Sequence, residues 1–330
     1  MHQTPFFTLR RFDLVERAQP APTLLIVPPL SGHFPVVMRD VVLGLLPDFT
    51  VSVLDWSNVR HVPTSCGRFG FEDNIRAVSD AIGLCGTGLS VLALCQGGIP
   101  AFAAVADIAQ RTPGHNPAAL ALVAAPVDPL ANPTPVVRLI REKSRYWYDI
   151  VPIGRVGSDH DGWGRWVYPA ELQLTALSRY LDQAKARNTE LARKISDDDG
   201  ADPVHFPFGD LYTSVMDLDA RQFAENIDRV FLSRALLQGT LRLDGRVIDP
   251  AAITDTALMT IDGALDEIAA PGQTQAAHAL TPAIPAKARK TLVAPECGHF
   301  GLFHGACWRR RILPDVRKFF LSHSGAGHGS

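Results

Sequence analysis

The sequence predicts an α/β fold in which a mostly parallel central sheet is interrupted by an inserted, mainly helical segment. Apolar, strand-like runs alternate with helix-like stretches early in the chain, and this alternation stops in the middle and resumes near the end. Strand, helix and strand at this spacing predict right-handed crossovers and parallel pairing. The strand-like runs are residues 23–28, 49–54, 89–94, 119–124, 257–262 and 291–294.

Three helix-like stretches separate the first four runs, at residues 36–46, 71–84 and 99–110. The N-terminal stretch "FFTLRRFDLV" could add an antiparallel strand at the sheet edge. Between about 133 and 250 the chain is rich in polar helix-like stretches and aromatic residues, and it contains no convincing buried strand. We therefore expect a core made of residues 1–132 and 251–330, and a cap domain inserted at 133–250.

Composition narrows the class of protein. With 330 residues, 46% of them hydrophobic, the chain can bury one large core or two modest ones. A net charge of −2 provides no broad basic surface for nucleic acid. No apolar run is long enough for a membrane span, and the N-terminus lacks the apolar core of a signal peptide. We expect a soluble, cytoplasmic protein with no nucleic-acid partner.

The five cysteines predict reduced thiols. They stand at 66, 85, 95, 297 and 307, an odd number without a C-x-x-C motif. Cys66, Cys85, Cys297 and Cys307 have no catalytic context and are interpreted as structural.

No metal or other cofactor is expected. His299 and His304 are five residues apart and would not share a helix face. The acidic stretch at 196–202 lacks the glycine and distant glutamate of a calcium loop, and a solvated turn is the simpler reading.

The stretch "VLALCQGG" at 91–98 carries the first chemical signal. A buried strand runs into Cys95, and two glycines then allow a sharp turn into a helix. This is the setting of the nucleophile elbow, usually written G-x-S-x-G, and here the pattern is Ala93-x-Cys95-x-Gly97. The stretch predicts an α/β-hydrolase fold with Cys95 as the nucleophile.

The other two groups of a catalytic triad follow in the order typical of α/β hydrolases, which is nucleophile, acid and histidine. Asp266 follows the strand at 257–262, and His299 follows the strand at 291–294. The alternatives are Asp262, Glu267 and Asp128 for the acid, and His304 and His278 for the base. Asp262 lies on or at the end of a strand, so Glu267 is the more credible rival of Asp266. His278 falls within a helical stretch and is expected to be exposed, so His299 is favoured as the base.

An oxyanion hole would combine two backbone N–H groups. The first belongs to Gln96, the residue after the nucleophile. The second comes from "PPLSGHF" at 28–34, at Leu30 or Ser31, because the prolines cannot donate. Gly32 would leave room for substrate. His33 could face the pocket, although a loop histidine bonded to backbone is an equally good interpretation.

The chain resembles intracellular polyhydroxybutyrate depolymerases, which are cysteine-type α/β hydrolases distantly related to polyhydroxyalkanoate synthases. The likeness runs from about residue 23 to residue 320. It departs from the family in having Gly97 where members often have proline after Cys-Gln, and in lacking a longer N-terminal region. The stretches that carry it are "PPLSGHF", "VLDW", "ALCQGG", "APVDPLANPTPV", "VYPAELQLTAL", "MDLDA", "DPAAITDTALMTIDGALDEIAAPGQTQAAH" and "CGHFGLFHGACW".

The resemblance implies a triad at Cys95, Asp266 and His299, and a polyester of (R)-3-hydroxybutyrate as substrate. It also implies attack by the thiol, an acyl-thioester intermediate and a location in the cytoplasm at the surface of polymer granules. Aromatic side chains of the cap could line the polymer channel, with ordinary cap packing as the equal alternative. These candidates are Trp147, Trp163, Trp166 and Tyr168.

Two other functions stay open at this stage. An acyltransferase or a coenzyme A-dependent thiolytic enzyme would use the same site with a different acceptor. A non-catalytic granule-associated protein would keep the fold alone. The sequence also leaves the oligomeric state open, with a homodimer as one option.

Overall fold

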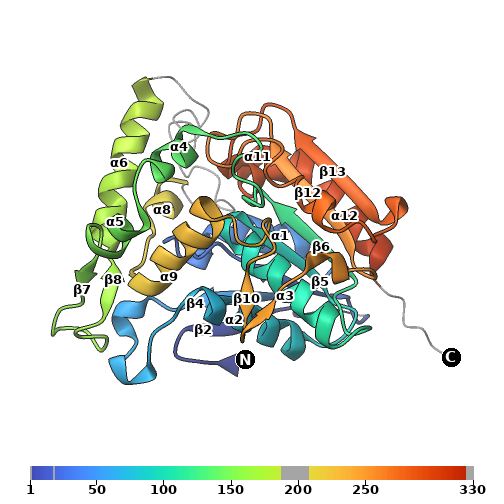
Figure 1. Cartoon of the computed structure of the whole chain (residues 1–330). Coiled ribbons are helices and arrows are strands. Elements are labelled where there is room, and N and C mark those ends of the chain that lie inside the picture. Colours follow the sequence, from blue (N-terminus) through green and yellow to red (C-terminus); the bar gives the residue numbers. More distant parts are fainter. Residues whose placement is uncertain (1, 18, 187–207, 325–330) are drawn as a thin grey trace.

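The central sheet of the protein has eight strands. The computed structural model describes residues 2–17, 19–186 and 208–324 (Figure 1). Across the sheet the order is β1-β2-β4-β3-β5-β6-β12-β13. In chain order the strands are β1 (His2–Gln3), β2 (Phe7–Phe12), β3 (Thr23–Val27), β4 (Thr50–Trp56), β5 (Ser90–Leu94), β6 (Ala119–Val123), β12 (Ala257–Gly263) and β13 (Arg289–Ala294).

All six predicted strands are present within two residues of their expected ends, and β4, β3, β5, β6, β12 and β13 pair in parallel. The N-terminal stretch forms β2 and pairs antiparallel with β4, as predicted. It is not the edge strand, however, because the short β1 pairs on its outer side.

Helices cover both faces of this sheet. The helices of the core are α1 (Arg39–Leu45), α2 (Phe71–Cys85), α3 (Gly98–Arg111), α10 (Ala277–Leu280), α11 (Gly305–Cys307) and α12 (Leu313–His323). Leu25 of β3 packs in the same cluster as Phe102 of α3, whereas its neighbour Ile26 packs with Phe320 of α12. Successive side chains of a strand point to opposite faces, so a strand covered on both faces must be apolar throughout. This is why the predicted runs lack polar alternation.

The middle of the chain folds outside the central sheet. Within the described residues, no strand between 133 and 250 joins that sheet. Figure 1 shows α5, α6 and α8 grouped at the opposite side of the molecule from β13 and α12. The elements are α4 (Pro135–Arg141), α5 (Arg145–Ile150), β7 (Gly154–Arg155), β8 (Trp166–Tyr168), α6 (Ala170–Ala186), α8 (Phe208–Thr213), β9 (Leu218–Asp219), α9 (Ala220–Asn226), β10 (Arg242–Leu243) and β11 (Arg246–Val247).

One expectation for this segment is wrong, because it does contain short strands with buried residues. β7, β8 and β9 form a three-stranded antiparallel sheet in which Val167 and Leu218 are buried. Strands of two or three residues are too short to produce a recognisable period-2 pattern in the sequence.

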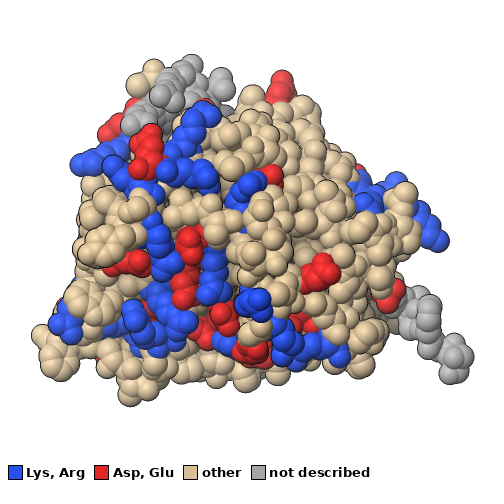
Figure 2. Space-filling model, viewed as in Figure 1, with Lys and Arg blue, Asp and Glu red and all other residues tan. Residues whose placement is uncertain are grey.

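An ion pair of Arg60 and hydrogen bonds of Arg165 join this middle segment to the rest of the chain. Arg60 lies 2.9 Å from Asp217, and the buried Arg165 lies 3.0 Å from Asp219 while donating to the carbonyls of residues 62, 63 and 67. Figure 2 shows Lys or Arg alternating with Asp or Glu across the face that carries α9, α2 and β10. Neither sign of charge dominates that face.

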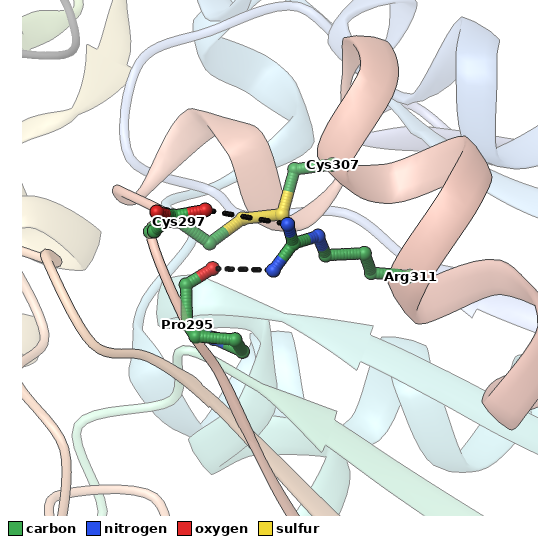
Figure 3. Close-up of a disulfide and its surroundings, with 5 residues drawn as sticks. Pro295, Cys297, Cys307 and Arg311 are labelled. Atoms are coloured by element: carbon green, nitrogen blue, oxygen red, sulfur yellow. Dashed lines mark hydrogen bonds and ion pairs between the residues drawn. A yellow bond between two sulfur atoms is a disulfide. The ribbon is translucent and has the colours of Figure 1, made fainter.

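The expectation of reduced thiols is wrong for two cysteines. Cys297 and Cys307 form a disulfide, with their Cα atoms 6.4 Å apart (Figure 3). Beside the disulfide, Arg311 donates a hydrogen bond to the Pro295 carbonyl and forms an ion pair with the Glu296 carboxylate. Ten residues separate the two cysteines, and only the turns between β13 and α11 bring them together. Among the free cysteines, Cys66 is exposed, Cys85 half-buried and Cys95 buried.

The described parts of the chain contain no helix long and apolar enough to cross a membrane. They also contain no cluster of three or more His, Cys, Asp or Glu side chains that could hold a metal ion. The acidic stretch at 196–202 lies outside the described residues.

Candidate active site

Cys95 lies at the carboxyl end of β5, in a turn that leads directly into α3. Its φ of +49° places a non-glycine residue in the left-handed region, as a sharp strand-to-helix turn requires. A Cβ at Gly97 would lie 2.6 Å from the Pro28 carbonyl oxygen, and one at Gly98 would lie 2.4 Å from the Ala125 Cβ. The two glycines therefore let the turn pack against the Pro28 backbone and the Ala125 side chain, and this explains why they follow the cysteine.

Asp266 lies in the loop after β12 and is buried. Its Oδ1 accepts backbone hydrogen bonds from Ile268 (2.7 Å) and Ala269 (2.8 Å). The Leu265 N–H donates to the Cys297 carbonyl at 3.0 Å, which ties this loop to the chain segment that carries His299. The carboxylate is thus held in one orientation, with Oδ2 left for another donor.

His299 occupies that position. Its Nδ1 lies 2.8 Å from Asp266 Oδ2, and its ring also interacts with the Cys95 side chain. Burial by itself lowers the pKa of His299, but the interactions with the Asp266 carboxylate and the Cys95 side chain outweigh it and raise that pKa well above its usual value. Phe300 and Phe303 meet the imidazole edge-on. Cysteine, imidazole and carboxylate therefore form one continuous line of contacts.

The rival acids lie elsewhere. Glu267 is exposed, unlike its neighbour Asp266. Asp128 pairs with Arg234 at 2.9 Å. Asp262 is fully buried within β12 and accepts from the Gly272 N–H, and burial raises its pKa.

The rival histidines also have other partners. His304 is buried with its Nε2 3.9 Å from Asp40. His278 is half-buried on α10, where its Nε2 lies 3.0 Å from the Thr260 hydroxyl. His278 is therefore not the exposed side chain that its helical pattern indicated.

The loop 28–34 is anchored at both ends. Trp56, from the "VLDW" stretch, donates to the Pro28 carbonyl at 3.2 Å. At the other end Met216 donates to the Gly32 carbonyl (2.7 Å), and Phe34 donates to the Ser214 carbonyl (3.0 Å). Core strand β4 and the middle segment together hold the loop in which the second oxyanion donor is expected.

Leu30 is buried and Ser31 is half-buried within this loop. Gly32 has a φ of +115°, and a Cβ there would lie 1.6 Å from the Gln173 Oε1. The space at Gly32 is thus filled by a side chain from α6, and the expectation that it leaves room for substrate is wrong. Gln173 reaches this position because its amide donates to the Met216 and Tyr168 carbonyls.

His33 lies close enough to His299 for the two side chains to interact electrostatically. Its Nε2 lies 3.0 Å from the Tyr212 carbonyl, and its ring meets Phe300 edge-on at 6.3 Å. Burial lowers the pKa of His33, the Tyr212 carbonyl opposes this shift, and the nearby His299 adds to it. The interpretation of His33 as a loop histidine bonded to backbone is therefore confirmed, and its role in substrate binding stays a prediction.

One contact at the elbow could not be found from the sequence. The side-chain Oε1 of Gln96 accepts a 2.9 Å hydrogen bond from Asn226 Nδ2 on α9. The two residues are 130 positions apart, and Asn226 belongs to no motif.

The four candidate cap aromatics have contacts of their own. Tyr168 stacks on Phe223 with the ring centres 4.1 Å apart, and Arg155 lies over Trp166 at 4.9 Å. Trp147 is half-buried beside Tyr148, and Trp163 is 66% exposed. Within the described residues, none of their ring contacts is with Cys95 or His299, so their role in substrate binding stays a prediction.

Comparison with known protein families gives independent evidence of the family to which this chain belongs. Residues 124–324 match the family model described as PHB de-polymerase C-terminus, where PHB is polyhydroxybutyrate. The matched range spans more than half of the chain. The protein belongs to this family. Asp266 and His299 lie within the matched residues, and Cys95 precedes them. No curated protein sequence matches this member of the family.

Solved structures are similar to this family member in fold. A hydrolase from Pseudomonas aeruginosa is 14% identical, with a TM-score of 0.55 and coverage of 97% of this chain and 94% of that one. A monoglyceride lipase from Saccharomyces cerevisiae is 13% identical, with a TM-score of 0.55 and coverage of 97% and 92%. An alpha/beta hydrolase fold protein from Nakamurella multipartita is 14% identical, with a TM-score of 0.50 and coverage of 95% and 95%. The fold is that of the α/β hydrolases.

Proposed function

We propose that the protein is a carboxylic ester hydrolase that cleaves poly(3-hydroxybutyrate), with Cys95 as nucleophile, His299 as base and Asp266 as the acid that orients it. The observation that carries this proposal is the line of contacts from Cys95 through His299 to Asp266, in a member of the PHB de-polymerase family. Nucleophilic acyl transfer needs these three kinds of group in this order.

The reaction begins with transfer of the Cys95 proton to His299, which the raised pKa of His299 favours. The sulfur attacks the ester carbonyl, and the backbone N–H groups of Gln96 and of Leu30 or Ser31 bind the developing oxyanion. His299 then protonates the leaving alkoxide, and a 3-hydroxyacyl thioester of Cys95 remains. Water, deprotonated by His299, attacks this thioester and releases a 3-hydroxy acid with the thiol restored.

Asp266 has a separate task in this scheme. Its hydrogen bond to Nδ1 selects the tautomer whose Nε2 can exchange a proton with sulfur, and its charge stabilises the imidazolium. The backbone bonds from Ile268 and Ala269 hold the carboxylate in this orientation. His33 and the cap aromatics would contact the polymer, and the proposed partner is the surface of an amorphous polymer granule in the cytoplasm.

The test is product analysis on the full-length protein. Purified protein is incubated with amorphous or crystalline poly(3-hydroxybutyrate), and the soluble products are identified by mass spectrometry. We expect 3-hydroxy acids from the amorphous polymer, and none with Cys95→Ala. Coenzyme A thioesters appearing only when coenzyme A is added would indicate a thiolytic enzyme instead. Granule binding without any product would indicate a non-catalytic role.

A further inference from the structure

Helix α9 turns two amide side chains toward the proposed oxyanion hole. Gln222 and Asn226 are one helical turn apart, so they lie on the same face, and they are only 2% and 5% exposed. Asn226 donates to the side chain of Gln96, the first expected oxyanion donor. This contact fixes where the buried face of α9 meets the elbow.

Gln222 lies one turn earlier, beside the second expected donor. It lines a small cavity together with Leu30 of the oxyanion loop, and this cavity has room for about one water-sized group, roughly 10 Å³. The other walls are mainly apolar, from Phe6, Trp56, Phe69 and Leu218. Ser57 and Asp219 also line the cavity, and the Asp219 carboxylate already accepts hydrogen bonds from Arg165 and from the backbone.

The carbonyl oxygen of the Gln222 amide is chemically unsatisfied. Gln222 Oε1 is buried and has no hydrogen-bond partner among the described residues. A buried acceptor left without a donor is costly, so a bound group that carries an O–H would be favoured at this position. A hydroxyl group is small enough for the cavity, and its O–H can donate the hydrogen bond that Gln222 Oε1 lacks.

We propose that Gln222 binds the free 3-hydroxyl of the acyl unit that Cys95 attacks, an inference that rests on the proposed function. In a 3-hydroxyacyl ester the hydroxyl is two carbon atoms from the reacting carbonyl, and Leu30, a candidate for the second oxyanion donor, also lines this cavity. Inside the polymer every 3-hydroxyl is esterified, and only the terminal unit carries a free one. Cleavage therefore proceeds from the hydroxyl end. The terminal ester bond breaks, the 3-hydroxyacyl group passes to Cys95 and then to water, and the shortened chain leaves with a new free hydroxyl.

The first experiment compares two esters of one chromophoric alcohol, (R)-3-hydroxybutyrate and butyrate. Gln222→Met keeps the side-chain length and removes the acceptor. We expect kcat/KM for the hydroxy ester to fall about 10- to 100-fold, with the butyrate ester within about threefold. The matched control is Gln238→Met, the same change at an exposed position, which leaves both esters unaffected. Equal losses for both esters, or no loss for either, would overturn the inference.

The second experiment uses the unaltered protein and does not depend on how a variant folds. A trimer of (R)-3-hydroxybutyrate is compared with the same trimer acetylated at its hydroxyl end. We expect monomer as the first product of the free trimer, and cleavage at least about tenfold slower for the capped one. Equal cleavage of both trimers contradicts the role of Gln222 while leaving the ester hydrolase intact. Cleavage of neither trimer nor either simple ester means that the proposed function itself has failed.

Discussion

The imidazole of His299 and the carboxylate of Asp266 meet through a 2.8 Å hydrogen bond, although the two residues are 33 positions apart in the chain. Each lies in a loop after one of two adjacent parallel strands, β12 and β13. Because parallel strands end at the same edge of the sheet, their loops are neighbours in space. The Leu265 to Cys297 backbone bond keeps the two loops in register.

Asp266→Asn should lower kcat by roughly 10² to 10⁴, because the amide loses the charge that stabilises the imidazolium. A cysteine nucleophile is easier to deprotonate than serine, so the loss can be smaller than in serine proteases. The neighbouring Glu267→Gln, at an exposed position, is the matched control and should stay within about tenfold. Steady-state kinetics on a soluble ester measure both, and a crippled Glu267→Gln beside an active Asp266→Asn would mean that the acid is wrongly assigned.

Iodoacetamide should inactivate the protein by alkylating Cys95. Cys66 is exposed and will also react, so the experiment is best carried out on Cys66→Ser, which should keep full activity. Peptide mass spectrometry locates the label while residual activity is followed in the same samples. Full activity after complete labelling of Cys95 would exclude it as the nucleophile.

Removing the Cys297–Cys307 disulfide should destabilise the region that carries His299. The bond closes a short loop, and loss of such a bond costs about 2 to 4 kcal/mol in the chain-entropy account. Cys297→Ser/Cys307→Ser should therefore lower the free energy of unfolding in a urea titration, and a reducing agent should lower it equally in the parent protein. The double variant itself should not respond to reductant, whereas the control Cys85→Ser, which keeps the disulfide, should lose stability in reductant as the parent does. No shift in the double variant would show that the bond does not stabilise the fold.

The pKa of His299 predicts how stability changes with pH. A histidine whose pKa is raised on folding binds its proton more tightly in the folded state. The stabilisation is fully present below the unfolded pKa of about 6.5 and is lost as pH rises through the higher folded pKa. The difference in Tm between the parent and His299→Gln should thus shrink as the pH rises above about 6.5. A difference that grows with pH would contradict the ion pair with Asp266 and Cys95.

Gly32→Ala should destabilise the protein by more than the cost of placing a non-glycine residue at a positive φ. Its Cβ would overlap the Gln173 amide, whereas Gly86 has a similarly positive φ of +88° with open space around it. Gly86→Ala therefore measures the conformational strain by itself, about 1 kcal/mol or more. We expect a larger loss of stability for Gly32→Ala, together with a fall in kcat. Equal effects from the two substitutions would mean that Gln173 moves aside without consequence.

The sequence by itself determined the class of the fold and the end of the sheet at which chemistry could occur. Strands covered on both faces must be apolar throughout, so β3, β5 and β6 were recognisable without any structure. The Gly97-Gly98 pair after Cys95 marked the turn, because only glycine tolerates such close backbone approach. The order of residues along the chain then selected Asp266 and His299 as candidates. It could not predict the distance between their side chains.

Only the tertiary structure decided which distant residues meet. The Gln173 amide against Gly32 and the Asn226 contact with Gln96 join residues without a shared motif. The disulfide joins two cysteines of one stretch, Cys297 and Cys307, whose pairing the sequence pattern did not predict. Hydrogen bonds and disulfides depend on positions to within a fraction of an ångström, and loops set those positions. Local sequence encodes periodicity and turns, whereas the partner of a buried polar group depends on how separate elements pack. The missing partner of Gln222 Oε1 is one example, because it depends on how α9 packs against the oxyanion loop.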